Sequence, residues 1–315
     1  MLALNTCGRD EHKHPRLWTL GIGYRYQGSD RHFVGTVEQK QREVLGNQIY
    51  NLYHLMDISI ERQVTARWSV SAALPVLFTH RNQLYNPKGK YVVNGIGDFT
   101  IGGRAWVFKP PTESGDNISV GMFLKVPTGR YNSMGLATNA AGQQIMATAD
   151  QSIQAGDSGT GFILELQGYK RIKWQSELYF AGSYLFNPRN TSGVSTFRTA
   201  RGEGVMSVAD QYLYRGGIGR PVPKIRGLAV SFGGRFEGVP VRDAFGGSDG
   251  FRRPGYAISL DPGLMYVRGP YTFSCNIPWA IERNRKRSVT DIANGRHGDA
   301  AFADYALLFG LSRRF

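Results

Sequence analysis

Six histidines are the residues of this chain whose type could support hydrolytic chemistry. A hydrolase with a serine nucleophile needs a histidine base within reach of that serine. No histidine here is followed two residues later by serine. The six are His12, His14, His32, His54, His80 and His297. We therefore predict that the chain is not an enzyme.

Residues that could hold a metal ion or a nucleotide are also sparse. His12 and His14 offer only two ligands on a terminal segment, which is an incomplete metal site. Cys7 and Cys275 lie far apart in the sequence, which argues against a thiolate cluster or a disulfide framework. The Gly-x-Gly at 95–97 precedes a strand-like segment, whereas a dinucleotide site needs a helix there. We predict no cofactor and no metal.

The charged residues recur with a period of two inside otherwise apolar segments. In residues 18–26 every second residue is apolar, and Arg25 stands on the opposite side. This spacing is that of a β-strand, whose successive side chains point to opposite faces. The charged residues on the polar side are Arg25, Asp57, Arg104, Lys125, Glu165, Glu177, Arg215, Arg235, Glu237, Asp261 and Asp304. Between the strand ends, the apolar side carries no Asp, Glu, Lys or Arg.

Twelve segments carry this alternation, and most approach the length of a tilted membrane strand. They are residues 17–28, 49–62, 67–78, 98–108, 118–127, 160–170, 174–186, 211–220, 227–238, 255–267, 271–281 and 301–315. The connections between them alternate between short and long. The long ones are 29–48, 79–97, 128–159, 187–210, 239–254 and 282–300. Short turns at one end and long loops at the other are typical of an antiparallel barrel.

The position of the charges distinguishes a membrane barrel from a soluble one. A Lys or Arg that faces lipid at the midplane costs about 2 to 4 kcal/mol, so lipid removes charges from one face only. A soluble barrel turns its apolar face inward instead. We predict an all-β fold, a transmembrane antiparallel up-and-down barrel of about 12 strands with short periplasmic turns and long extracellular loops. Residues 1–16 would form an N-terminal periplasmic tail and 17–315 a single barrel domain.

Two further features support an outer-membrane location. Aromatic residues cluster near the segment ends, as the two girdles of a membrane barrel require. The girdle residues we single out are Trp18, Trp68, Trp174, Trp279 and Phe315. The last residues, YALLFGLSRRF, resemble the C-terminal assembly signal of bacterial outer-membrane proteins.

The start, MLALNTC, turns polar at GRDEHKHPR, so no signal peptide is visible in this chain.

Three stretches carry a resemblance to a known family. They are GIGDFTIGGRAWVF at 95–108, SVGMFLKVPTGRYNS at 119–133 and GDSGTGFILELQGYKRI at 156–172. They resemble the outer-membrane β-barrel family described as transporters of the meta-pathway of phenol degradation. The resemblance implies an outer-membrane location and the uptake or export of small, often aromatic, molecules.

We therefore expect an outer-membrane channel or transporter that passes small, aromatic or otherwise weakly polar solutes through a narrow charged lumen. A barrel of about 8 strands is filled by side chains, whereas one of about 16 encloses an aqueous channel, so twelve should leave a narrow pore. Arg104 with Glu165, and Arg235 with Glu237 and Asp261, are expected to line it or to brace the barrel. Within 128–159, the segment NAAGQQ is the candidate constriction.

Two alternatives remain open. One is an outer-membrane scaffold or surface-assembly component that transports nothing. The other is a surface lipase of the barrel type, for which His54, expected on the lipid face, is the one suitably placed histidine. The prolines do not separate these alternatives: Pro75, Pro127, Pro262 and Pro278 predict bulges or frayed pairing because proline donates no ladder bond.

The net charge of +14 raises the question of a polyanionic partner. A basic run, Arg283, Arg285, Lys286 and Arg287, lies in the long connection 282–300. There we expect it to contact lipopolysaccharide phosphates. The predicted partners are outer-membrane lipid, lipopolysaccharide and a small-molecule solute, with no nucleic acid. The oligomeric state stays open.

Overall fold

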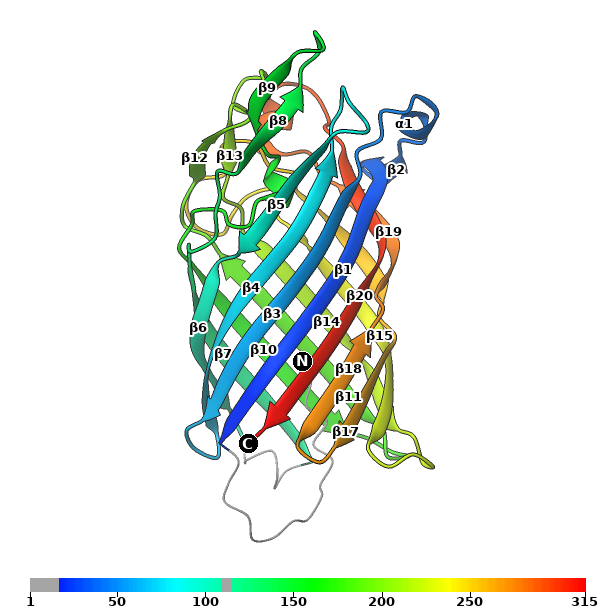
Figure 1. The fold of residues 1–315 in the computed structure, drawn as a ribbon. Coiled ribbons are helices and arrows are strands. Elements are labelled where there is room, and N and C mark those ends of the chain that lie inside the picture. Colours follow the sequence, from blue (N-terminus) through cyan, green and yellow to red (C-terminus); the bar gives the residue numbers. More distant parts are fainter. Residues whose placement is uncertain (1–16, 109–114) are drawn as a thin grey trace.

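The computed structural model describes residues 17–108 and 115–315, which form one closed antiparallel β-barrel (Figure 1). The wall has twelve strands, three of them broken into two segments. The unbroken strands are β1 (Trp18–Val34), β3 (Asn51–Gln63), β4 (Trp68–Asn82), β7 (Asp116–Val126), β10 (Gly161–Arg171), β11 (Glu177–Phe186), β14 (Gln211–Pro221), β15 (Leu228–Val239) and β20 (Ala300–Arg314). The broken ones are β5 (Lys90–Ile96) with β6 (Phe99–Trp106), β16 (Gly255–Leu260) with β17 (Gly263–Arg268), and β18 (Tyr271–Asn276) with β19 (Trp279–Arg285).

The first and last strands close the barrel. β1 pairs with β20 from Thr19 opposite Arg314 to Phe33 opposite Ala300. The remaining elements belong to the loops at the upper end of Figure 1. They are β2 (Val37–Glu38), α1 (Gln41–Val44), β8 (Met134–Thr138), β9 (Gln144–Thr148), the 3₁₀ turn η1 (Gln151–Ile153), β12 (Thr191–Ser195), β13 (Val205–Ser207) and α2 (Val289–Ala293). Within the described residues, neither helix is long and apolar enough to cross a membrane.

The fold class and the twelve strands are confirmed, and the bounds differ in an instructive way. β1, β4 and β19 extend beyond the expected ends, to Val34, Asn82 and Arg285. These strand ends lie beyond the apolar band. Both of their faces carry polar residues, so the sequence shows no apolar–polar alternation there. β11 starts later than expected because Trp174 and Gln175 have φ angles of 58° and 57°, which place them in a turn.

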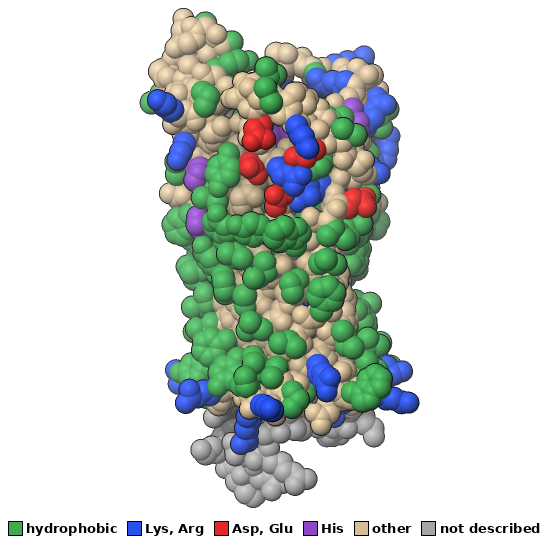
Figure 2. Space-filling model, turned by 90° about the vertical axis from the view of Figure 1, so that its right-hand side faces the viewer, with side chains coloured by type: hydrophobic (Ala, Val, Ile, Leu, Met, Phe, Trp, Pro, Cys, Tyr) green, Lys and Arg blue, Asp and Glu red, His purple; other side chains and the backbone are tan. Residues whose placement is uncertain are grey.

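The two faces of the wall have the composition of a membrane barrel. Val70 and Leu124 point outward and are 49% and 46% exposed. Lys125, next to Leu124 along β7, points inward and is 5% exposed. Figure 2 shows the outward apolar side chains as a band across this face of the wall, with basic side chains gathered at its lower edge. The apolar face is therefore outside, as lipid requires.

Prolines interrupt the ladder at two places, as the sequence predicts. Pro75 lies inside β4, opposite the break between β5 and β6, and its carbonyl accepts a hydrogen bond from Gly97 at 2.7 Å. Pro262 and Pro278 break the neighbouring strands β16–β17 and β18–β19. Pro127 simply follows the end of β7. These breaks leave two interruptions in the wall, one beside Pro75 and one between β19 and β20.

Candidate functional site

The lower half of the lumen is crossed by an ion-pair group centred on Arg104. Its guanidinium lies 2.5 Å from Glu165 on β10 and 3.7 Å from Glu61 on β3. The same guanidinium lies over the ring of Phe123, 5.7 Å from its centroid. Because these residues come from four strands, the group fills part of the cross-section as well as bracing the wall.

A second group lies near mid-height. Arg25 on β1 and Glu237 on β15 approach to 3.8 Å across strands that are not neighbours. Glu237 also accepts a 2.8 Å hydrogen bond from Arg235. Asp261, which the sequence assigns to Arg235, pairs with Arg215 at 3.2 Å instead. The break at Pro262 turns the Asp261 backbone toward Gly233, whose carbonyl accepts its N–H.

The other charges singled out from the sequence have different surroundings. Asp57 and Glu177 share the inward face by their pairing register, Asp57 opposite Gly23 and Glu177 opposite Gly219. Asp304 lies at the edge of the wall, bound by Arg31 at 2.7 Å. Their assignment to a solute pathway stays a prediction.

Sequence reasoning missed a set of apolar side chains on the inward face. They lie in the upper halves of five strands and are partly exposed toward the lumen: Leu55, Leu77, Ile163, Leu185 and Leu213. Their orientation follows from register, since Arg25 stands opposite Leu55 and Glu237 opposite Leu213. The period-two alternation could have revealed these residues, because each lies an even number of positions from an inward charged residue on its own strand or pairs with such a residue on the next strand. We call this set the apolar collar.

The three family-like stretches meet at one point of the wall. Lys125 lies between Asp98 and Asp157, with its Nζ 3.4 Å and 2.5 Å from their carboxylates. The N–H of Gly129 donates to Asp98, and the backbones of Gly129 and Gly156 approach so closely that a Cβ on either would clash. We call these five residues the Lys125 junction. It seals the interruption beside Pro75.

The loop 128–159 enters the lumen, but not through the segment that the sequence suggests. NAAGQQ forms the tip of the β8–β9 hairpin, which projects away from the barrel (Figure 1). Residues 149–155 turn inward instead, and we call them the plug. Ile153 is fully buried and packs with Val93 and Leu77. The strands on either side of NAAGQQ pair with each other, so this segment stays at the tip of the hairpin. The part of the loop that reaches the mouth of the barrel is therefore the plug.

Asp150 anchors the plug to the barrel. Its carboxylate accepts two hydrogen bonds from Arg253, at 2.8 Å and 2.7 Å, and lies 3.5 Å from Arg81 on β4. Burial by itself would raise the pKa of Asp150, but the guanidinium groups of Arg253 and Arg81 outweigh it and hold the pKa well below its ordinary value. Asp150 is therefore a buried, charged carboxylate at the mouth of the lumen.

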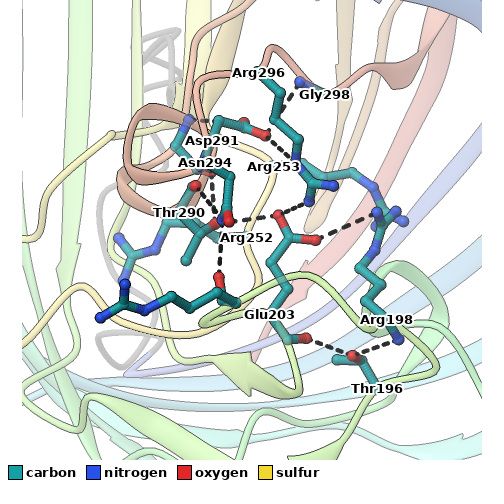
Figure 3. Close-up of polar contacts among 12 residues, drawn as sticks. Thr196, Arg198, Glu203, Arg252, Arg253, Thr290, Asp291, Asn294, Arg296 and Gly298 are labelled. Atoms are coloured by element: carbon teal, nitrogen blue, oxygen red, sulfur yellow. Dashed lines mark hydrogen bonds and ion pairs between the residues drawn. The ribbon is translucent and has the colours of Figure 1, made fainter.

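A second group of ion pairs lies in the loops close to Arg253, the residue that binds Asp150 (Figure 3). Arg198 and Arg296 point toward Glu203, and both are paired with it. The guanidinium carbons of Arg198 and Arg253 lie 3.8 Å and 4.7 Å from the ring centroid of buried Phe251. Burial, together with the charge of Arg253, lowers the pKa of Arg198 to about 10. Arginine side chains thus dominate the mouth.

The second interruption of the wall lies between β19 and β20, above Trp279 and Tyr305, whose rings stack at 6.1 Å. Asp304 is bound there by Arg31 and Arg283, and Arg31 also binds Glu38 at 2.7 Å. Figure 2 shows acidic and basic side chains gathered on this side of the wall above the apolar band. We call Arg31, Glu38, Arg283 and Asp304 the seam.

Half of the basic run near residue 285 lies elsewhere than the sequence predicts, and lipopolysaccharide contact by the other half stays a prediction. Arg283 and Arg285 lie within β19 and are buried, paired with Asp304 and Asp291. Lys286 and Arg287 are exposed, but the guanidinium of Arg287 donates to the carbonyl of Arg296. The Nζ of Lys286 lies 5.5 Å from the ring of Tyr256. The predicted environment of Arg283 and Arg285 was wrong because β19 continues to Arg285, into the segment that the sequence analysis assigns to a loop.

The remaining candidates concern enzymatic chemistry. His54 points outward, as predicted, and its Nδ1 lies 2.7 Å from the hydroxyl of Tyr24 rather than beside a serine. In residues 17–108 and 115–315, no group of three or more His, Cys, Asp and Glu could hold a metal ion. His12, His14 and Cys7 lie outside the described residues. The predicted girdle residues Trp18, Trp68, Trp174, Trp279 and Phe315 are all exposed on the outer surface.

Comparison with known proteins places the fold among bacterial outer-membrane barrels. The COG4313 outer membrane channel from Pseudomonas putida F1 is similar to this chain with a TM-score of 0.62 and 11% identity, over 98% of this chain and 99% of that one. The beta domain of the Bordetella autotransporter BrkA has a TM-score of 0.51 and 13% identity, over 94% and 99%. The translocator domain of the autotransporter NalP from Neisseria meningitidis has 0.50 and 10%, over 97% and 90%.

No family model matches the chain, and no curated protein sequence does. The structural likeness nevertheless shows the fold: the chain forms a closed antiparallel β-barrel of twelve strands, like those of outer-membrane channels. The similar structures include a channel and the barrels of autotransporters. Fold alone therefore does not decide the function, which depends on the side chains that line the lumen.

Proposed function

We propose that this barrel is a channel for small, aromatic or otherwise weakly polar solutes. The observation that carries the proposal is the apolar collar. Leucine and isoleucine side chains that remain partly exposed inside a barrel lower the cost of moving a weakly polar solute out of water. The COG4313 channel, similar in fold, is a precedent for a channel function on this architecture.

The pathway we propose runs from the plug, past the collar and the mid-height ion-pair group, to the Arg104 group in the lower half of the lumen. Arg104 and Glu165, and Arg25 and Glu237, would narrow it and exclude large solutes. Paired charges present little net field, so they would select by size more than by charge.

The test is uptake into Gram-negative cells whose lipopolysaccharide slows passive entry. Cells producing the protein should take up radiolabelled phenol faster than cells without it. Leu185→Asn should lower phenol uptake severalfold by placing an amide in the collar, while uptake of glycerol stays the same. Leu185→Met is the matched control, since it keeps the site apolar.

The plug favours a second candidate, a scaffold that transports nothing. A loop segment that is packed into the mouth by buried Ile153 and anchored by Asp150 suits a barrel whose role is at its surface. Planar bilayers separate the candidates. If the purified protein gives no ionic current above the lipid baseline and the producing cells take up no extra phenol, the scaffold is favoured and the channel is rejected.

A further inference from the structure

We propose that Arg81 and Arg253 form a receptor for the carboxylate of an amphiphilic acid, and that Asp150 of the plug occupies this receptor until such a solute displaces it. The inference deepens the proposed function and rests on it, because it names one substrate class of the same pathway that the mouth recognises by charge: small acids with an apolar body, such as aromatic or short aliphatic carboxylates.

The first argument is the geometry of the two guanidinium groups. Arg253 grips Asp150 with two parallel hydrogen bonds, the arrangement in which arginine recognises a carboxylate. Arg81 adds a second positive charge at 3.5 Å and is itself held by Asn51 at 2.7 Å. Both arginines are therefore oriented before any solute arrives.

The second argument is what stands next to the receptor. The plug presents a carboxylate at Asp150 and an apolar side chain at Ile153, which packs with Leu77 and Val93. An amphiphilic acid offers the same pair of features, a charged head and an apolar body. The plug thus resembles a bound solute in chemistry, and the collar residue Leu77 continues the apolar surface into the lumen.

The third argument concerns energetics. An ion pair is an inefficient way to hold a buried segment in place, since apolar residues of similar volume often do as well or better. A carboxylate at position 150, however, makes a contact with Arg81 and Arg253 that the carboxylate of a solute can replace. A solute carboxylate restores the charged hydrogen bonds that Asp150 gives up, whereas a neutral solute leaves two partly buried guanidinium groups without a counter-charge.

The remaining contacts of the plug permit such a release. The hydroxyl of Tyr53 donates to the carbonyl of Ser152 at 2.6 Å, and that of Thr79 to the carbonyl of Ile153 at 3.1 Å. Gln151 donates to the carbonyl of Ser207. These neutral hydrogen bonds are individually weak, so Asp150 is the strongest single anchor.

Calorimetry on the purified full-length protein tests the receptor directly. Sodium benzoate is the probe and benzamide its neutral analogue. Asp150→Asn removes the tethered competitor, so benzoate should bind at least about tenfold more tightly than to the wild type, because a tethered group competes at an effective concentration in the millimolar range. Benzamide should bind weakly to both proteins.

The double variant Asp150→Asn/Arg253→Met should lose most of the benzoate affinity gained by Asp150→Asn. Arg242→Met in the Asp150→Asn background is the matched control, an exposed arginine of the same loop layer, and should leave binding unchanged. A shift in gel mobility between unheated and boiled samples verifies that each barrel is folded. Arg81→Met provides an independent variant of the same receptor.

Two outcomes overturn the inference: benzoate that binds Asp150→Asn no better than the wild type, or binding that survives both arginine substitutions. Uptake into cells separates this result from the proposed function. Phenol uptake without selective benzoate binding leaves the channel standing and removes the receptor. Selective benzoate binding without any solute uptake supports the receptor and removes the channel.

Discussion

The Lys125 junction and the seam interrupt the same wall and are filled by different chemistry. At the junction, buried Lys125 binds two carboxylates and a backbone N–H donates to Asp98. At the seam, Arg31 and Asp304 are each more than a third exposed and the strands are joined by side chains. Proline breaks of similar origin are therefore sealed in two ways, by the backbone with a buried charge or by exposed ion pairs.

The difference predicts unequal strength. A buried pair that loses one partner leaves an uncompensated charge in a low dielectric, whereas exposed pairs contribute little because water and salt screen them. The junction should therefore hold the wall rigidly. The seam should be the part of the wall that separates first.

The largest effect is expected for Lys125→Met. Removing the ammonium leaves Asp98 and Asp157 close together without their shared cation, which should lower the free energy of unfolding by about 3 to 5 kcal/mol. The urea midpoint of the barrel in detergent micelles measures this loss. Lys170→Met, an exposed lysine of β10, is the control and should unfold like the wild type. An unchanged midpoint for Lys125→Met would remove the distinction between the two interruptions.

A pH titration of Asp299 extends the comparison to the top of the seam, where His32 of β1 meets the residue before β20. Nδ1 of His32 lies 3.0 Å and Nε of Arg42 lies 2.6 Å from the Asp299 carboxylate. Burial would raise the pKa of Asp299, but the hydrogen bond with His32 and the charge of Arg42 lower it to about 2, from an ordinary value of 3.8.

Because the folded pKa is the lower one, Asp299 stabilises the barrel above pH 4 or so, and this contribution disappears as the pH falls through about 2. Asp299→Asn should therefore lower the free energy of unfolding by about 2 kcal/mol at pH 7. The same urea titrations at pH 2 should show almost no difference from the wild type. A difference that persists undiminished at low pH would assign the effect to lost packing instead.

The smallest effect is expected at the seam itself. Asp304→Asn should lower the free energy of unfolding by about 1 kcal/mol or less, since Asp304 and Arg31 are each more than a third exposed and water screens their attraction. Buried Arg283 keeps its hydrogen bond to the carbonyl of Ala303. Molar sodium chloride should weaken that difference further. Asp157→Asn removes the same charge from the junction and should cost more. If the two variants are equally destabilised, exposure does not decide the strength of these pairs.

The register of inward and outward residues was predictable from the sequence to a large extent. Lipid excludes charge from one face, so the spacing of Arg104, Lys125 and Arg235 suffices to assign them to the inward face. The collar residues alternate with the outward residues in the same way. A leucine among inward polar residues, however, indicates its orientation less clearly than a charged residue does. The partners of the charges were less accessible: Asp261 pairs with Arg215 because Pro262 breaks its strand.

The loops were the least predictable part. Period-two alternation ends where the strands leave the apolar band, so Arg283 and Arg285 read as loop residues although they lie in β19. The plug has no periodic signal either. Its position depends on contacts with Arg81 and Arg253, which are far from Asp150 in the chain.

The strands, their order and the face that meets lipid are all encoded locally along the chain, because a uniform hydrocarbon environment imposes the same alternation on every strand. The pairing of the charges, the choice of the loop that fills the mouth and the sealing of each break in the wall have no such local code. They depend on distances between residues remote in sequence, and closure of the barrel sets those distances.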